Sequence, residues 1–167
     1  MKKVIIINGA MGVGKTTVSR ALCEILPSNV FLDGDWCWDS HPFIVNDETI
    51  ELVKKNITTL LNNFIGCSAY QFVVFCWVLH DKLLLNDICS KIDKESCNIH
   101  IYTLTCSETE LLKRLNKDIS CGVRKIDIIR RALSRLKSCN LLETQKVDVE
   151  GQTAEQVAAS LKKMIMK

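Results

Sequence analysis

The sequence has little proline, little glycine and no long apolar run. Proline occurs twice and glycine seven times in 167 residues, which excludes collagen-like and disordered chains. The longest uninterrupted apolar run, residues 72–79, has eight members, whereas a transmembrane helix needs about 20. The chain length is typical of one domain. We therefore predict a single domain over residues 1–167 that makes no contact with a membrane.

The first seven residues have only a superficial resemblance to a signal peptide. Two lysines precede an apolar stretch, but this stretch is short, leads directly into a glycine-rich loop and is followed by no cleavage site. We therefore expect a cytoplasmic protein.

Histidine is scarce, and the cysteines lack the spacing of a metal site. The chain has three histidines and nine cysteines, and no two cysteines lie closer than eight positions, so no CxxC pair exists. A structural zinc site is therefore not expected. A disulfide framework would leave one cysteine over in a chain without a secretion signal. We expect most cysteines to pack as small buried hydrophobic side chains.

Acidic residues are few in one segment. Residues 111–139 carry nine Lys and Arg against two acids, while the remainder carries thirteen against seventeen. Such a basic segment suits an anionic ligand. Nucleic acid is one such ligand, but no recognised nucleic-acid motif accompanies the segment, and we expect no nucleic-acid partner.

What is present is an alternation of apolar strands and amphipathic helices. Strands are expected at 4–8, 30–33, 71–79, 98–105 and 146–149, and helices at 15–26, 47–65, 82–92, 108–118, 125–138 and from 154 onward. The expected helix caps are Asp47, Asp81 and two capping boxes, Ser107-x-x-Glu110 and Thr153-x-x-Gln156. The pattern predicts an α/β fold with a parallel sheet covered by helices on both faces, and the very apolar strand 71–79 is expected at its centre.

A phosphate-binding loop is the strongest motif. Residues 9–16 match G-x-x-x-x-G-K-[ST] between a buried strand and a helix. Backbone N–H groups of such a loop and the helix N-terminus surround a phosphate chain, the lysine reaches the β- and γ-phosphates, and the hydroxyl serves Mg²⁺. A plain glycine turn would not need the Lys-Thr pair. The predicted nucleotide-binding residues are Gly9, Ala10, Met11, Gly12, Val13, Gly14, Lys15, Thr16 and Thr17.

Two carboxylates follow the second strand. In an extended chain, Asp33 and Asp35 project to the same side, and Gly34 between them permits a close approach. The carboxyl ends of parallel strands meet the phosphate loop at one edge of the sheet. One carboxylate can orient or deprotonate a substrate hydroxyl, and the other can hold Mg²⁺ through water. A solvated turn is the alternative.

These two motifs carry a family resemblance. Residues 9–17 together with Leu32-Asp33-Gly34-Asp35 resemble the small P-loop kinases, the group of shikimate, gluconate and adenylylsulfate kinases and chloramphenicol phosphotransferase. By element order the resemblance covers most of the chain. It implies a three-layer sandwich of the P-loop nucleoside triphosphate hydrolase, nucleotide kinase-like type. The sheet would be five-stranded and parallel with the first strand central, and a short lid at about 114–131 would cover ATP.

The resemblance also implies roles for individual residues. Asp35 is the better candidate for the base, and Thr16 and Asp33 would lie close to Mg²⁺, although the sequence alone does not separate the roles of the two aspartates. Arg114 resembles the arginine that lies against adenine, and Arg124 the one that closes on the phosphates. Guanidinium suits both tasks because it is planar, permanently charged and able to stack.

Further arginines follow in the expected helix 125–138. A charged face is expected from Arg124, Asp127, Arg131 and Arg135, and an apolar stripe from Ile126, Ile129, Leu133 and Leu136. A merely solvated charged face is the alternative. The lid has no repeated arginine pair, so the arginine that supports the transition state is not determined.

Several other residues are candidates at the same edge of the sheet. The acid that usually ends the third strand is absent from residues 72–79, and Asp81 or Asp33 could replace it. His80 could contact substrate, and Trp36 and Trp38 could form a substrate wall or pack in the core. Residues 148–151 fit the D-x-x-G of GTPases on the wrong strand, which we interpret as coincidence. The loop 150–153 is expected near the base.

Together these patterns predict an ATP- and Mg²⁺-dependent kinase that transfers the γ-phosphate to the hydroxyl of a small-molecule acceptor. The predicted catalytic residues are Lys15, Asp35, Asp33 and Arg124. One alternative is a nucleoside or nucleotide kinase in which Arg131 and Arg135 hold an acceptor phosphate. Another is a nucleotide-binding ATPase or regulatory module without an acceptor. The sequence determines neither the acceptor, nor ATP over GTP, nor the oligomeric state.

Overall fold

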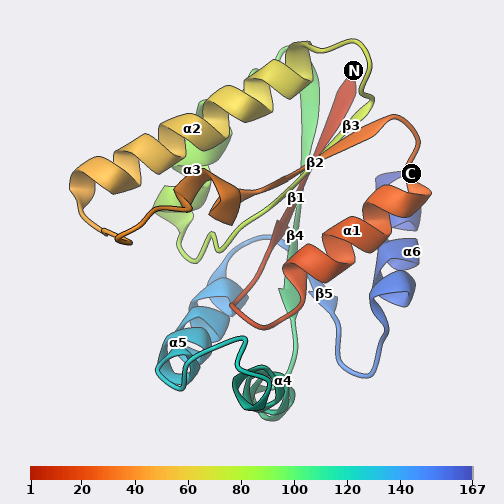
Figure 1. Ribbon diagram of the computed structural model, residues 1–167. Coiled ribbons are helices and arrows are strands. Elements are labelled where there is room, and N and C mark those ends of the chain that lie inside the picture. Colours follow the sequence, from red (N-terminus) through yellow and green to blue (C-terminus); the bar gives the residue numbers. More distant parts are fainter. Residues whose placement is uncertain (167) are drawn as a thin grey trace.

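The computed structural model describes residues 1–166, and its strands and helices alternate along the chain (Figure 1). The elements are β1 (Lys2–Asn8), α1 (Lys15–Ile25), β2 (Asn29–Asp33), the short 3-10 helix η1 (Gly34–Trp38), α2 (Asp47–Gly66), β3 (Phe72–Cys76), α3 (Lys82–Ser90), β4 (Cys97–Thr105), α4 (Glu108–Ser120), α5 (Ile128–Leu141), β5 (Gln145–Asp148) and α6 (Ala154–Ile165). Within these residues no helix combines the length and the apolar character that crossing a membrane requires.

The five strands form one parallel sheet in the order β2-β3-β1-β4-β5. This confirms the α/β fold with a five-stranded parallel sheet. β1 lies at the centre, and its residues Val4, Ile5, Ile6 and Ile7 are completely buried. The expectation that strand 71–79 is central is therefore wrong by one position. β1 has seven residues and pairs with β3 on one side and the nine-residue β4 on the other, while β3 lies between β1 and the edge strand β2.

Helices cover both faces of the sheet, which gives three layers (Figure 1). Side chains of β1 alternate between the two cores, because successive residues of a strand point to opposite faces. Ile5 and Ile7 belong to the core that α1, α4, α5 and α6 close, whereas Val4 and Ile6 belong to the core under α2 and α3. The carboxyl ends of the strands therefore lie between two helical layers, where parallel sheets bind ligands.

β3 ends three residues earlier than the sequence predicts. The buried side chain of Asn8 accepts a hydrogen bond from Leu79 N–H (2.8 Å) and donates one to Leu79 C=O (2.9 Å). These bonds replace the ladder bonds that a longer β3 would make with its neighbours. β3 therefore ends at Cys76, even though residues 77–79 are as apolar as the strand before them.

The start of α5 also differs from the prediction. The helix begins at Ile128, and Asp127 precedes it without a capping side-chain bond. Arg124 and Asp127 therefore do not share a helical face with Arg131 and Arg135, and that prediction is wrong. Ile126 is 75% exposed and does not join the apolar stripe.

The helix caps follow the sequence with two exceptions. Asp81 and the Thr153–Gln156 box cap their helices as predicted. α2 is capped by Asn46, one residue before Asp47, since its side chain accepts from Thr49 N–H. At α4, Ser107 accepts from Glu110 N–H, but the Glu110 side chain does not complete the box. The carboxylate of Glu150 accepts from Ser107 N–H instead.

Candidate functional site

The loop between β1 and α1 lines one cavity. Gly12 (φ 84°) and Gly14 (φ 106°) adopt left-handed conformations that side chains disfavour. A Cβ at Gly12 would lie 2.6 Å from Cδ2 of Leu115, so α4 packs directly on the loop. Gly14 caps α1 without a side-chain bond, and the first turn of this helix holds no acid. Its N–H groups are therefore available to an anion, which the helix dipole also favours.

Lys15 lies beside this loop with its ammonium directed back onto it. Its Nζ donates to Ala10 C=O at 3.0 Å. Loss of water around the ammonium lowers the pKa of Lys15, and the nearby carboxylates of Asp35 and Asp33 oppose this effect. A cation of this kind gains from a negatively charged ligand in the same space.

Asp33 joins the end of β2 to the first turn of α1. Its Oδ2 accepts from the Thr16 hydroxyl at 2.8 Å, and its Oδ1 accepts from Asp35 N–H at 3.1 Å. Asp33 is only 6% exposed. In the sheet it lies opposite Cys76, the last residue of β3, where the usual acid is absent. Asp33 is thus the acid that this edge of the sheet places against the Thr16 hydroxyl.

Asp35 lies in η1, two residues beyond the end of β2. Its Oδ1 accepts a hydrogen bond from the Trp77 indole N–H at 3.1 Å. Although the residue as a whole is exposed, loss of water around its carboxylate raises the pKa of Asp35, and the charge of Asp33 raises it further. Lys15, the Trp77 hydrogen bond and Arg124 act in the opposite direction. A carboxylate with a raised pKa is a better proton acceptor than an ordinary surface aspartate.

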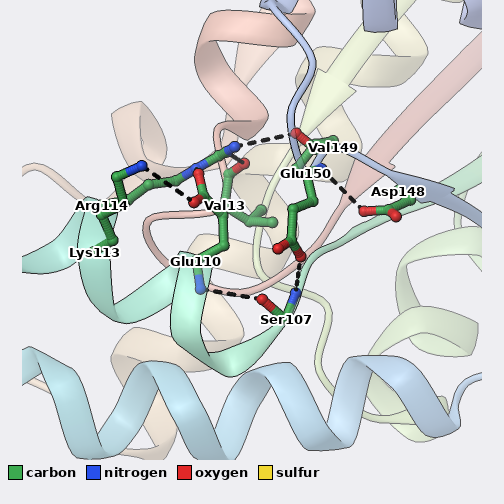
Figure 2. A network of polar contacts seen from close by, with 8 residues as sticks. All are labelled: Val13, Ser107, Glu110, Lys113, Arg114, Asp148, Val149 and Glu150. Carbon is green, nitrogen blue, oxygen red and sulfur yellow. Dashed lines mark hydrogen bonds and ion pairs between the residues drawn. The ribbon is translucent and has the colours of Figure 1, made fainter.

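Arg114 connects three parts of the chain (Figure 2). Its Nε donates to Glu110 at 2.7 Å, one terminal nitrogen to Val13 C=O at 2.9 Å, and the other to Val149 C=O at 3.1 Å. The guanidinium therefore fastens the phosphate loop to the segment between β5 and α6. Because each of its three nitrogens already donates to the protein, Arg114 is better placed to offer its flat face than to bind a phosphate.

Arg124 lies in the loop between α4 and α5. Its Nε donates to Asp118 Oδ2 at 3.0 Å, and both side chains are about one-third exposed. This ion pair is partly solvated and therefore weak. Arg124 can exchange Asp118 for a more highly charged partner at little cost.

A single cavity of about 460 Å³ collects these groups. Of the predicted site residues it is lined by Met11, Gly12, Val13, Gly14, Lys15, Thr16, Thr17, Asp33, Asp35, Arg114 and Arg124. Gly9 and Ala10 are buried and do not line it. The cavity also includes Lys117, Asp118, Val149 and Gln152, none of which the motifs indicate individually. Gln152 belongs to the loop 150–153, which was expected near the nucleobase of the nucleotide.

Other candidates lie outside this cavity. Trp36 packs edge-on against Phe31 under the guanidinium of Arg20, and Trp38 packs on Phe43. His80 contacts Asp81 at 3.1 Å. Burial and then the charge of Arg135 lower the pKa of His80. A substrate role for His80, Trp36 or Trp38 therefore stays a prediction.

Sequence reasoning missed two residues of the site, Trp77 and Asn8. Trp77 is 9% exposed and supplies the hydrogen bond to Asp35, and Asn8 holds the segment that carries Trp77. A weak signal exists for both. A buried indole usually needs an acceptor, and a lone amide at the end of a wholly apolar strand needs partners.

The donor set fits a magnesium ion that is bound together with a nucleotide. Among residues 1–166 no cluster of three His, Cys, Asp or Glu could hold a metal by itself. Mg²⁺ is usually held by one or two protein oxygens together with phosphate oxygens and water. The Thr16 hydroxyl and the Asp33 carboxylate are oxygens of the right kind, next to the loop that would hold the phosphates.

The fold and the loop define the class of protein. A parallel sheet with a glycine loop of this sequence between its central strand and the following helix is the arrangement of P-loop proteins. The family model described as AAA domain matches residues 5–133, and the chain belongs to this family. No protein of curated function matches the chain.

Solved structures of similar fold include enzymes that act on small molecules. The tunicamycin resistance protein of Deinococcus radiodurans is 19% identical with a TM-score of 0.72, over 99% of this chain and 96% of the other. Shikimate kinase of Acinetobacter baumannii, in complex with shikimate, is 19% identical with a TM-score of 0.68, over 99% and 94%. A gluconokinase of Sinorhizobium meliloti is 17% identical with a TM-score of 0.66, over 99% and 94%. This likeness concerns the fold, and it confirms the resemblance to small P-loop kinases.

Proposed function

We propose that the protein is a kinase that transfers the γ-phosphate of ATP, with Mg²⁺, to the hydroxyl of a small-molecule acceptor. The observation that carries the proposal is the position of Asp35 in the cavity of the phosphate loop. A protein that only binds a nucleotide does not need a carboxylate with a raised pKa in this cavity. A hydrolase could use the same carboxylate to orient water, so a panel of acceptors distinguishes transfer from hydrolysis. The tunicamycin resistance protein, shikimate kinase and gluconokinase folds support an acceptor of small-molecule size.

The chain's own groups divide the work. N–H groups of residues 12–17 and the Lys15 ammonium bind the phosphates. Mg²⁺, when bound beside Thr16 and Asp33, neutralises charge on the phosphates. Asp35 accepts a hydrogen bond from the acceptor hydroxyl and then its proton as the new oxygen–phosphorus bond forms. The bond between the γ-phosphorus and the β,γ-bridging oxygen breaks at the same time, and ADP leaves. Arg124 leaves Asp118 for the transferring phosphoryl group, and closure of the lid 114–131 excludes water that would compete as acceptor.

The same cavity offers a place for the nucleobase. Arg114, Val149 and Gln152 are among its lining residues. The Gln152 amide donates to Asp148 C=O at 2.7 Å. We propose that the nucleobase of ATP packs on the flat face of Arg114 and that the loop 150–153 lies along the edge of the nucleobase.

Calorimetry and an acceptor panel test this function. MgATP is titrated into the wild-type protein and into Lys15→Ala, with Lys163→Ala as the control for loss of an exposed lysine. ATP consumption is then measured with shikimate, gluconate, neutral polyols, nucleosides and nucleoside monophosphates. We expect heat of MgATP binding that Lys15→Ala weakens, and turnover that one class of acceptor stimulates.

Two results would contradict the proposal. If well-folded protein gave no heat with millimolar MgATP, the nucleotide site would be refuted. If ATP were hydrolysed slowly and no acceptor raised the rate, the protein would be an ATPase or regulatory module rather than a kinase. Stimulation by nucleosides or nucleoside monophosphates alone would identify a nucleoside or nucleotide kinase.

A further inference from the structure

The two oxygens of the Asp35 carboxylate have different surroundings. Oδ1 accepts the indole hydrogen bond of Trp77 at 3.1 Å. Oδ2 accepts no hydrogen bond from any residue in the range 1–166, and Asp35 lines the cavity that holds the phosphate loop. One oxygen is therefore engaged by the protein, and the other is available to a ligand.

Trp77 is itself held firmly. Only 9% of it is exposed, and its ring packs in the core under α2 and α3. Its backbone N–H donates to Ile7 C=O at 3.4 Å, and Asn8 holds Leu79 by two bonds. A Cβ on Gly34 would lie only 2.5 Å from the Trp77 ring, so the indole also packs against the backbone directly before Asp35. The indole N–H is thus a donor with a fixed place and direction.

We infer that Trp77 is the positioning residue of Asp35, which holds one carboxylate oxygen so that the other faces the acceptor hydroxyl. The inference rests on the proposed role of Asp35 as the base. The inference also assigns a role to the segment after β3, where the usual acid is missing. The segment after this strand supplies an indole that orients the base, while the carboxylate that serves the metal comes from β2.

The hydrogen bond has an electrostatic consequence. The charged groups that face Asp35 are Asp33, which raises its pKa, and Lys15 and Arg124, which lower it. Trp77 adds a neutral donor that stabilises the ionised form and so lowers the pKa as well. Removal of this donor leaves the raising effects of desolvation and Asp33 less opposed.

Trp77→Phe is the test variant, because it keeps an aromatic ring and removes the indole donor together with part of the buried ring. Trp38→Phe is a matched control, since Trp38 lies in the same core and its indole N–H is buried without an acceptor among residues 1–166. The chain has three tryptophans, so proton–nitrogen NMR of isotope-labelled protein shows three indole N–H signals. Each is assigned by its loss in a Trp→Phe variant and compared, without ligand, between wild type and Asp35→Ala.

We expect the Trp77 signal, and not the Trp38 signal, to move when Asp35→Ala removes the carboxylate acceptor. Trp77→Phe should lower kcat for phosphoryl transfer by about 10-fold with the KM for ATP unchanged, because a hydrogen bond to a charged group is lost, whereas Trp38→Phe should leave kcat unchanged. A Trp77 signal that is the same in folded wild type and Asp35→Ala, or a Trp77→Phe variant with the kcat of Trp38→Phe, would overturn the inference.

The outcome is separable from that of the proposed function. If Asp35→Asn abolished transfer but the Trp77 signal was unchanged in Asp35→Ala, only the positioning role would fail. If the Trp77 signal moved in Asp35→Ala but Asp35→Asn transferred phosphate normally, Asp35 would not be the general base, and the positioning role proposed for Trp77 would fail with it.

Discussion

The hydroxyl of Thr16 donates a hydrogen bond to Oδ2 of Asp33 at 2.8 Å, which joins the start of α1 to the end of β2. The other oxygen of Asp33 accepts from Asp35 N–H, so protein donors occupy both oxygens of this buried carboxylate. Asp35, in contrast, keeps one oxygen without a protein donor among residues 1–166. The difference separates two carboxylates that the sequence could not separate. It favours Asp33 as the organiser of the metal side and Asp35 as the proton acceptor.

The first prediction compares Asp35→Asn with Asp33→Asn. Asp35→Asn should lower the transfer rate by about 100-fold or more, because a general base contributes on that scale, while the Kd for MgATP stays nearly unchanged. Asp33→Asn should weaken MgATP binding, because the Thr16 contact and the negative charge beside the metal are altered. Rates and calorimetric affinities check this, with Asp39→Asn as the control for an exposed aspartate of the same segment. A loss of MgATP affinity in Asp35→Asn would move Asp35 to the metal.

The second prediction concerns the contact between Gly34 and Trp77. A Cβ at Gly34 would lie 2.5, 2.6 and 2.9 Å from three atoms of Trp77, whose side chain is buried in the core under α2 and α3. Gly34→Ala should therefore reduce the free energy of unfolding by about 1–3 kcal/mol. Gly66→Ala is the control, since a Cβ there would meet nothing within 4 Å. That variant should be neutral or slightly stabilising.

Chemical denaturation of both variants decides the question. Equal stability of Gly34→Ala and Gly66→Ala would show that η1 can shift away from Trp77, and the fixed relation of Trp77 to Asp35 would then be lost as well.

Motifs made of neighbouring residues were predictable from the sequence. The phosphate loop and the Asp33–Asp35 pair depend on local backbone geometry, which the glycines and the end of a strand predict directly. The contacts that complete the site link distant positions. Trp77 and Asp35 lie 42 residues apart, and Arg114 and Val13 lie 101 apart. No periodicity connects such pairs, because only the sheet order brings them together.

Two boundaries failed for equally specific reasons. The apolar run after Cys76 continues the pattern of a strand, but Asn8 draws Leu79 out of the ladder. The helical spacing before Ile128 is real in the sequence, yet Val123 N–H bonds to Asp118 C=O at 2.9 Å and closes a loop instead. In both places a tertiary or loop contact overrides a local preference.

The third prediction distinguishes the two lid arginines. Arg114→Met should reduce both stability and MgATP affinity, because it leaves Val13 C=O and Val149 C=O without their donor and unfastens the two walls of the base subsite. Arg124→Met should leave stability within about 1 kcal/mol, since its pair with Asp118 is partly solvated, and should slow transfer with little change in MgATP affinity.

Thermal denaturation, calorimetry and the rate of transfer separate these effects. Lys163→Ala serves as the control for loss of a distant surface cation. An Arg114→Met variant with normal stability would refute the proposed role of Arg114 in joining Val13 to Val149. Normal turnover in Arg124→Met would assign the transferring phosphate to another cation of the basic segment 111–139.

The last prediction follows from the raised pKa of Asp35 and concerns stability. The ordinary pKa of an aspartate is 3.8, and in the folded protein desolvation and the charge of Asp33 raise it. The folded state therefore binds this proton more tightly than the unfolded chain. As the pH rises from the unfolded to the folded pKa, the unfolded chain loses the proton first and stability falls. At neutral pH the full loss of stability from ionised Asp35 is present.

Asp35→Asn removes this loss and keeps an oxygen that can accept from Trp77, so the variant should be more stable than wild type at neutral pH. This gain should shrink in mildly acidic solution. Because Asp35 stays open to solvent, the gain in the free energy of unfolding should not exceed about 1 kcal/mol.

Urea denaturation at neutral and mildly acidic pH measures this gain, and Asp39→Asn corrects for the loss of an exposed charge. A destabilised Asp35→Asn at neutral pH would mean that Lys15, Trp77 and Arg124 outweigh desolvation and Asp33.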